Sequence, residues 1–199
     1  MFSNHPLNTA RDVDEIVEAV MSLFRFHGHA EYHGEAVSQF EHAVQAALLA
    51  KNLRPDDPEF VLAAFLHDIG HLCVSEGKIV QMGSYGVADH ETLGARYLMA
   101  RGFSARIARL VAAHVEAKRY LVATDPVYFA GLSEASRQTL ALQGGPMSPD
   151  EIAAFRQDSL LEEHLMLRRI DDQAKIPGQS VQDIFWLEML IRKHLLQRL

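Results

Sequence analysis

Apolar residues recur at the three- and four-residue spacing of amphipathic helices over almost the whole chain. The first helix is expected to begin at a cap on Thr9 or Asp12 and to run to about Arg25. Later helices are expected over residues 38–51, 57–68, 89–101, 104–121, a short stretch from 133, another from 148, 159–174 and 181–196. The pattern predicts an all-α protein.

Helix boundaries are marked by residues that favour caps and turns. Ser148 and Glu151 have the spacing of a capping box, and Asp57 precedes a proline that suits the first turn of a helix. Asp125-Pro126 is expected to break the chain. Two glycine-containing stretches, residues 26–37 and 74–88, are expected to be loops, and the polar density of the first suggests a site or a lid. Nothing resembles a linker, so residues 1–199 are predicted to form one domain.

The apolar run over residues 61–66 ends directly on His67 and Asp68. Burying these two polar groups costs free energy unless something binds them, and a divalent metal ion is a common solution. His71 would lie on the same face as His67 if the helix continued that far. The alternative is a polar helix end exposed to solvent.

Composition narrows the classes of function. The net charge is −7 with no basic run, which argues against a nucleic acid or an anionic membrane as the main partner. No apolar stretch approaches the roughly 20 residues that a membrane span needs. The single cysteine, Cys73, and the lack of a signal peptide lead us to expect a cytoplasmic protein.

Further histidine and aspartate residues lie on predicted helices in apolar company. Alone, each is more often a satisfied buried polar residue than a ligand, but six on five helices of a bundle are better explained together as a metal site. The candidate ligands are His42, His67, Asp68, His90, His114 and Asp171.

The order His42, His67-Asp68, Asp171 resembles the HD superfamily over nearly the full chain, which implies a single HD helical bundle. Flanking segments are similar to one subgroup, the HD-domain mixed-valent diiron oxygenases of organophosphonate catabolism. These segments include residues 32–39, 89–95, 114–121, 131–136 and 168–175.

The resemblance implies two iron ions, Fe(II) and Fe(III). His42, His67, Asp68 and Asp171 would hold one, and His90, His114 and a shared Asp68 the other. The expected reaction uses dioxygen to cleave the carbon–phosphorus bond of a 1-hydroxy-2-(amino or trimethylammonio)ethylphosphonate, releasing phosphate and glycine or glycine betaine. In the first loop Tyr32 and Glu35 would act as a gate. The ligand types alone would equally suit manganese, zinc or nickel.

A phosphonate dianion needs cationic or hydrogen-bonding partners. Lys118 lies one helical turn after His114, and Arg168 lies three residues before Asp171. Both are therefore expected to bind the anion, together with His71 and Ser136, whereas Arg169 and Lys175 are expected to be solvated surface charges.

Two other classes of function remain open. A metal-dependent HD phosphohydrolase acting on a phosphate ester could use the same metal centre and cations. A non-catalytic HD-like signalling or scaffold domain would usually have lost ligands, whereas this chain has all six.

Overall fold

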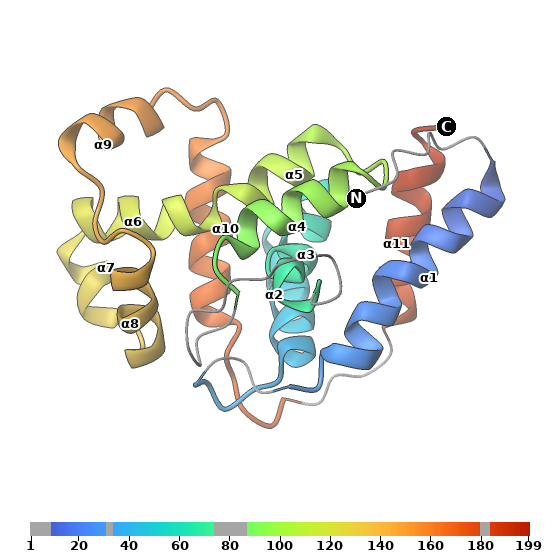
Figure 1. Ribbon diagram of the computed structural model, residues 1–199, viewed down its shortest axis with the longest axis horizontal. Coiled ribbons are helices and arrows are strands. Elements are labelled where there is room, and N and C mark those ends of the chain that lie inside the picture. Colours follow the sequence, from blue (N-terminus) through green and yellow to red (C-terminus); the bar gives the residue numbers. More distant parts are fainter. Residues whose placement is uncertain (1–8, 31–33, 74–86, 180–183) are drawn as a thin grey trace.

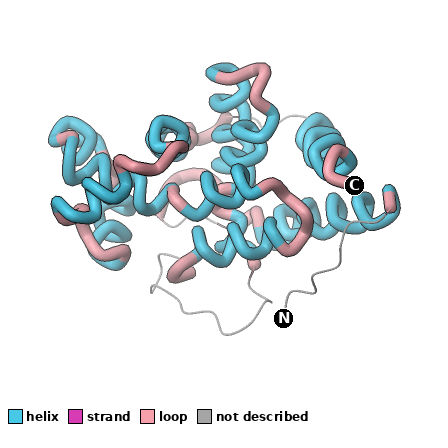
Figure 2. The backbone as a smooth tube through the Cα atoms, turned by 90° about the horizontal axis from the view of Figure 1, so that it is seen from above, coloured by secondary structure: helices cyan, strands magenta, loops and turns pink. Residues whose placement is uncertain are grey.

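The structure is a computed structural model, and it describes residues 9–30, 34–73, 87–179 and 184–199. The described residues form helices joined by loops and contain no strand, which confirms the predicted all-α class (Figure 2). The elements are α1 (Ala10–His27), α2 (Gln39–Leu53), α3 (Pro58–Leu66), η1 (Ile69–Leu72), α4 (His90–Met99), α5 (Ala105–Ala112), α6 (His114–Thr124), α7 (Pro126–Gly131), α8 (Glu134–Leu142), α9 (Pro149–Phe155), α10 (Leu161–Gln173) and α11 (Phe185–Leu196).

The helices pack around α3. Helices α1 and α11 lie side by side at one end, α6 to α9 make up the other end, and α2, α3 and α10 lie between them (Figure 1). Every side chain from Phe60 to Leu66 is buried, as expected for a helix that is apolar on all sides. The polar pair His67-Asp68 therefore follows directly from the apolar core, at the centre of the molecule.

Side-chain caps set most of the helix starts as predicted. Thr9, Ser38 and Ser148 each take part in a capping box, and Ser104 and Ser133 each accept a backbone N–H of the following turn. Asp89 also precedes its helix, but it has a left-handed φ of 55° and makes no side-chain cap bond.

Helix α3 ends at Leu66, close to the predicted end, and the chain then tightens into the 3-10 turn η1, so the helix does not continue to His71. Two other predicted boundaries were wrong. The long helix expected over 104–121 is interrupted at Ala113, where α5 gives way to α6. Asp125-Pro126 does not simply break the chain: Asp125 accepts two backbone N–H bonds and Pro126 opens the short helix α7.

Gly70 permits the close approach of η1 to the start of α4. A Cβ at this position would lie 1.9 Å from the carbonyl oxygen of His90 and 2.9 Å from the nitrogen of Gly94. These neighbours are backbone atoms, so neither can move out of the way by a change of rotamer. Because Gly70 has no side chain, η1 can pack directly against the backbone at the start of α4, and this contact fixes the position of His90.

Replacing Gly70 with alanine is therefore expected to lower the free energy of unfolding by about 3 kcal/mol, at the upper end of the overpacking range. Denaturant unfolding measures this change. Gly131→Ala is the control, since a Cβ there meets nothing within 4 Å. Equal stability of the two variants would contradict the proposed close packing.

Candidate metal centre

Four histidines share one arrangement of their ring nitrogens. The Nδ1 atoms of His67, His90 and His114 bond the carbonyl oxygen three residues earlier at 2.7 to 3.2 Å, and that of His42 bonds Ala174 O at 2.8 Å. A carbonyl accepts only, so each Nδ1 carries a hydrogen, and in the neutral ring each Nε2 presents a lone pair. This is the state in which imidazole binds a metal ion.

Helix ends supply the carbonyls that orient two of these rings. Ala64 lies in the last turn of α3 and Val111 in the last turn of α5, where backbone carbonyls lack a partner within the helix. His67 and His114 follow these ends and donate to them. The interruption at Ala113, which sequence analysis missed, thus makes a carbonyl available to orient His114.

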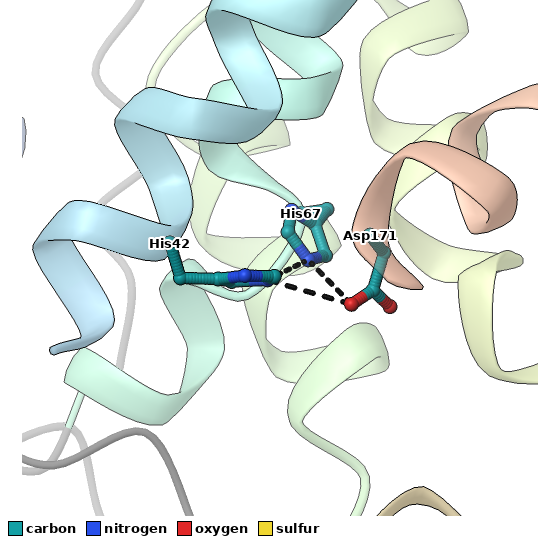
Figure 3. A group of neighbouring side chains, drawn as sticks. All are labelled: His42, His67 and Asp171. Atoms are coloured by element: carbon teal, nitrogen blue, oxygen red, sulfur yellow. Dashed lines mark hydrogen bonds and ion pairs between the residues drawn. The ribbon is translucent and has the colours of Figure 1, made fainter. Parts of the chain in front are cut away.

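One half of the cluster lies between α2, the end of α3 and α10. His42 Nε2 is 3.1 Å from His67 Nε2 and 3.4 Å from Asp171 Oδ1 (Figure 3). Asp171 Oδ1 is also 3.8 Å from His67 Nε2. The three buried ligand atoms lie close enough together to surround one metal ion.

The other half lies at the starts of α4 and α6. His90 Nε2 is 3.0 Å from His114 Nε2, and Asp68 Oδ1 is 3.4 Å and 3.3 Å from these two nitrogens. The second oxygen, Asp68 Oδ2, lies 3.6 Å from His42 Nε2 and 3.4 Å from His67 Nε2. Asp68 therefore presents one oxygen to each half of the cluster.

The donor set fits a pair of metal ions. Facing Nε2 lone pairs at 3.0 and 3.1 Å repel one another unless a proton or a metal ion lies between them. Asp68 Oδ2 is buried and has no hydrogen-bond donor among the described residues. A buried carboxylate oxygen without a donor is costly, and a metal ion would satisfy it.

Electrostatics favour a cation at the same place. Burial, followed by the charge of His67, lowers the pKa of His42 to about 4. Burial alone would lower the pKa of His67 as well, but Asp68 and Asp171 raise it to about 9. Although burial opposes the ionised form of Asp68, His67 and His114 hold its pKa well below its usual range. Protons and metal ions compete for such a cluster, so metal binding should strengthen as pH rises.

His71 differs from the four histidines in its tautomer. Its Nδ1 accepts the backbone N–H of Val87 at 3.1 Å, so the neutral ring carries its hydrogen on Nε2. The ring stacks on His90, with centroids 3.8 Å apart, and one of its nitrogens lies within 4.8 Å of ligand atoms of both Asp68 and His90. His71 is therefore suited to donate a hydrogen bond to a ligand bound at the centre.

A small cavity of about 50 Å³ opens beside the cluster. Asp68, His90, His114 and Asp171 line it, whereas His42 and His67 do not. Access to the cluster is therefore from the His90 and His114 side. The other lining residues are Glu35, His71, Val115, Lys118, Ala135, Ser136, Thr139, Gln143, Arg168 and Lys175.

The predicted anion-binding cations are buried beside this cavity. Lys118 is only 3% exposed and donates to Thr139 Oγ1 at 3.0 Å. Burial, and then the nearby Arg168 charge, lower the pKa of Lys118 to about 7. Arg168 is 4% exposed and donates to Asp171 Oδ2 at 2.5 Å. A cavity that opens onto two buried cations is suited to a small anion.

Lys175 was wrongly expected to be a solvated surface charge. Its side chain is only 12% exposed, and its Nζ lies 3.4 Å from both Glu35 Oε1 and Ser136 Oγ. The four-residue spacing from Asp171 was the available signal, since the same spacing separates His114 from Lys118. Thr139 and Gln143 carry no comparable signal and were also missed. Arg169 is exposed and pairs with Asp125, as expected.

The first loop contributes Glu35 to the cavity wall. Glu35 Oε1 accepts from Ser133 Oγ at 2.6 Å and lies beside Lys175. Ser133 in turn accepts the backbone N–H of Ser136, which also lines the cavity. Tyr32, the other predicted gate residue, lies outside the described residues.

The helical bundle, with a His-Asp pair at the end of its central helix, is that of an HD domain, and residues 39–162 match the HD domain family. The chain is 39% identical over 180 residues to the hydroxymethylphosphonate dioxygenase of Gimesia maris, covering 89% of this chain and 87% of that protein. It is 38% identical over 186 residues to the [1-hydroxy-2-(trimethylamino)ethyl]phosphonate dioxygenase (glycine-betaine-forming) of Leisingera caerulea, covering 90% of this chain and 92% of that protein. It is also 39% identical over 188 residues to the uncharacterized protein L432 of Acanthamoeba polyphaga mimivirus, covering 94% and 85%.

The chain belongs to the HD-domain phosphonate dioxygenase family, which confirms the resemblance inferred from its motifs. It is accordingly an oxygenase, and its clustered histidines and aspartates can accommodate a dinuclear metal site. Among the helices that the structure describes, none is both long and apolar enough to cross a bilayer.

Proposed function

We propose that this protein uses dioxygen to cleave the carbon–phosphorus bond of a small 1-hydroxyphosphonate, at a pair of iron ions held by His42, His67, Asp68, His90, His114 and Asp171. The substrate would be a 1-hydroxy-2-(amino or trimethylammonio)ethylphosphonate, and the products phosphate and glycine or glycine betaine. The observation that best supports the proposal is Asp68, which faces both histidine pairs beside a cavity lined by buried cations. The names of two relatives, both phosphonate dioxygenases, point the same way.

The reaction balances without a further reductant. The C1–P and C1–H bonds break, C1 becomes a carboxylate carbon, and phosphorus leaves as phosphate. One molecule of dioxygen supplies the two additional oxygen atoms and accepts the four electrons that the substrate loses. When bound, the iron pair would activate dioxygen and the C1 hydroxyl group.

The protein's own residues would bind and orient the substrate. Lys118, Ser136 and Arg168 line the cavity and would hold the phosphonate, with His71 donating from its Nε2 hydrogen. A phosphonate held in this way would direct the C1 hydroxyl toward His90 and His114, where the cavity meets the cluster. Holding both ends of a small substrate limits the orientations in which C1 can react.

Glu35 would recognise the cationic group on C2. Its carboxylate lines the same cavity and is fixed by Ser133 and Lys175. A primary amine would donate hydrogen bonds to this carboxylate, whereas a trimethylammonium group would interact with it by charge alone. Both substrates remain in the proposal, and their relative turnover distinguishes them.

The test is release of phosphate from three substrates, the hydroxymethyl, 2-amino-1-hydroxyethyl and 2-trimethylammonio-1-hydroxyethyl phosphonates, with and without dioxygen. We expect release that requires dioxygen, with consumption of one dioxygen per phosphate. Release that persists in anaerobic buffer would reject the oxygenase and favour a metal-dependent phosphohydrolase. No release from any of the three, together with metal-free protein, would favour a non-catalytic HD-like domain.

Replacing Lys118 with methionine is expected to raise KM about 10- to 100-fold with a smaller change in kcat. A hydrogen bond to a charged group contributes about 1.5–3 kcal/mol, and this contact exists before the chemical step. Steady-state kinetics measure the effect, and Lys51→Met, at an exposed lysine over the Trp186 ring, is the control. An unchanged KM would remove Lys118 from the binding site.

Because the pKa of Lys118 is lowered, the Lys118→Met variant should also differ from wild type in how its thermal stability depends on pH. Its pKa falls from 10.5 in the unfolded chain to about 7 in the substrate-free fold, so burying the ammonium disfavours folding below about pH 7. This penalty decreases as pH rises from about 7 to 10.5, as the folded-state lysine loses its proton. Substrate-free Lys118→Met should therefore melt at a higher temperature than wild type at pH 6, and the difference should shrink at pH 9.

A further inference from the structure

The two oxygens of Asp171 have different partners. Oδ1 faces His42 at 3.4 Å and His67 at 3.8 Å, and the second oxygen points away from both rings (Figure 3). This second oxygen, Oδ2, accepts a hydrogen bond from Arg168 Nη1 at 2.5 Å. The orientation of the ligand oxygen therefore depends on where the Arg168 guanidinium lies.

On the side away from Asp171, Arg168 contacts Asp172 and Tyr128, two residues without a role in the function proposed above. Its Nη2 donates to Asp172 Oδ1, and its Nε lies 3.2 Å from Asp172 Oδ2, which gives a two-point pairing of guanidinium and carboxylate. Tyr128 joins the same group: its hydroxyl accepts from Arg168 Nε at 3.0 Å and donates to Asp172 Oδ2 at 2.7 Å. Together these bonds fix the plane of the guanidinium.

Burial makes this arrangement rigid. Arg168 is 4% exposed and Asp171 1% exposed, so water cannot readily replace either partner. The guanidinium lies between two carboxylates, and the loss of one would leave an imperfectly paired buried charge. Tyr128 belongs to α7 and the other three residues to α10, so the contact also connects α7 to the helix that bears Asp171.

We propose that Asp172 and Tyr128 are positioning residues for the metal centre: they fix Arg168, and Arg168 turns Asp171 Oδ1 toward His42 and His67. This inference rests on the proposed metal centre, but not on the identity of the substrate. Neither residue lines the cavity in the described part of the chain, so neither is proposed to touch the substrate. Arg168 lines it and retains N–H groups for an anion.

Iron(II) binding provides the test. Full-length, metal-depleted protein is titrated anaerobically with Fe(II) in competition with a chromogenic chelator, as wild type, Asp172→Asn and Tyr128→Phe. Loss of a group that orients a metal ligand typically weakens metal binding 10- to 100-fold. We expect Asp172→Asn to lower the affinity for one of the two ions at least about tenfold and to leave the affinity for the other within about twofold of wild type. Asp172→Glu should restore part of the lost affinity. Tyr128→Phe should weaken the same ion by less than about tenfold.

Weaker binding of only one ion distinguishes a positioning role from a general structural role, because a loosened fold would lower the affinity for both ions. Tyr120→Phe is the matched control: it removes another buried tyrosine hydroxyl bonded to an arginine, Arg156, away from Asp171, and should bind both ions as wild type does. If Asp172→Asn and Tyr128→Phe fold and both bind the two ions with wild-type affinity, the positioning role is wrong, while the proposed metal centre stands. Should Asp172→Asn fail to fold, Tyr128→Phe decides. Wild type that binds no iron would overturn the metal centre and this inference together.

Discussion

Replacing Asp68 with alanine is expected to abolish binding of both metal ions and to reduce turnover below about 0.1% of wild type. Asp68 is the carboxylate that lies within 3.6 Å of all four imidazole Nε2 atoms, with one oxygen toward each pair. Its removal takes one ligand from each ion and leaves four clustered rings without their shared negative charge. A metal centre is worth several kcal/mol to its reaction, and about 4 kcal/mol corresponds to a thousandfold change in rate.

Elemental analysis after dialysis and phosphate release under air measure these two effects. Asp56→Ala is the control, since Asp56 is an exposed aspartate near the start of α3. Asp68→Asn keeps the size of the side chain and should also lose activity, which guards against a result caused only by a cavity in the fold. An Asp68→Ala protein that keeps two ions would show that Asp68 is not shared.

Much of the helical framework could be predicted because its signals are local. A capping residue such as Ser38 or Ser148 acts through atoms within one turn, and the sequence around it contains the whole interaction. The apolar run ending at Leu66 likewise predicts its own burial. Candidate ligands such as His67 and His114 follow from the same logic, because a titratable residue inside an apolar stretch needs a partner whatever the tertiary structure is. His90 lies between two acidic residues and was singled out only as a member of the whole set.

The features that were missed depend on contacts between distant segments. No glycine or proline marks the break at Ala113, and its consequence, a carbonyl for the His114 ring, is visible only once α5 and α6 are placed. Lys175 looked like a surface charge because its partners, Glu35 and Ser136, lie 140 and 39 residues away in sequence. Helix α7 was misread since a cap followed by proline begins a helix as readily as it ends one.

The cavity brings together charges that would otherwise be unfavourable. Lys118, Arg168 and Lys175 all line it, and burial opposes the charged form of Lys118 strongly enough to lower its pKa to about 7. A phosphonate dianion would pair with these cations, and the metal ions would pair with Asp68 and Asp171. Substrate and metal would each therefore stabilise a site that is under electrostatic strain without them, as functional sites often are.

Replacing His90 with alanine is expected to leave one metal ion bound and to abolish dioxygen-dependent phosphate release. The proposed ligands of the His90 and His114 half are these two rings and Asp68 Oδ1, since the neighbouring His71 ring already accepts the Val87 N–H through Nδ1. The proposed ligands of the other half are His42, His67, Asp171 and Asp68 Oδ2. Loss of one of its three ligands should prevent the first half from binding its metal ion. The second half keeps all four of its ligands and should still bind its ion. Because the cavity meets the cluster on the His90 side, the lost ion is the one that would contact substrate.

Elemental analysis of the purified variant should give about one metal ion per chain where wild type gives about two, and phosphate release should fall to background. His194→Ala is the matched control: His194 is also buried, accepts the backbone N–H of Ser104 at 3.2 Å, and lies on α11, outside the cluster. That control should lose stability yet keep both ions, because its ring has no part in the centre. Two ions in His90→Ala would show that His90 is not a ligand, and one ion with full turnover would show that a single metal suffices for the reaction.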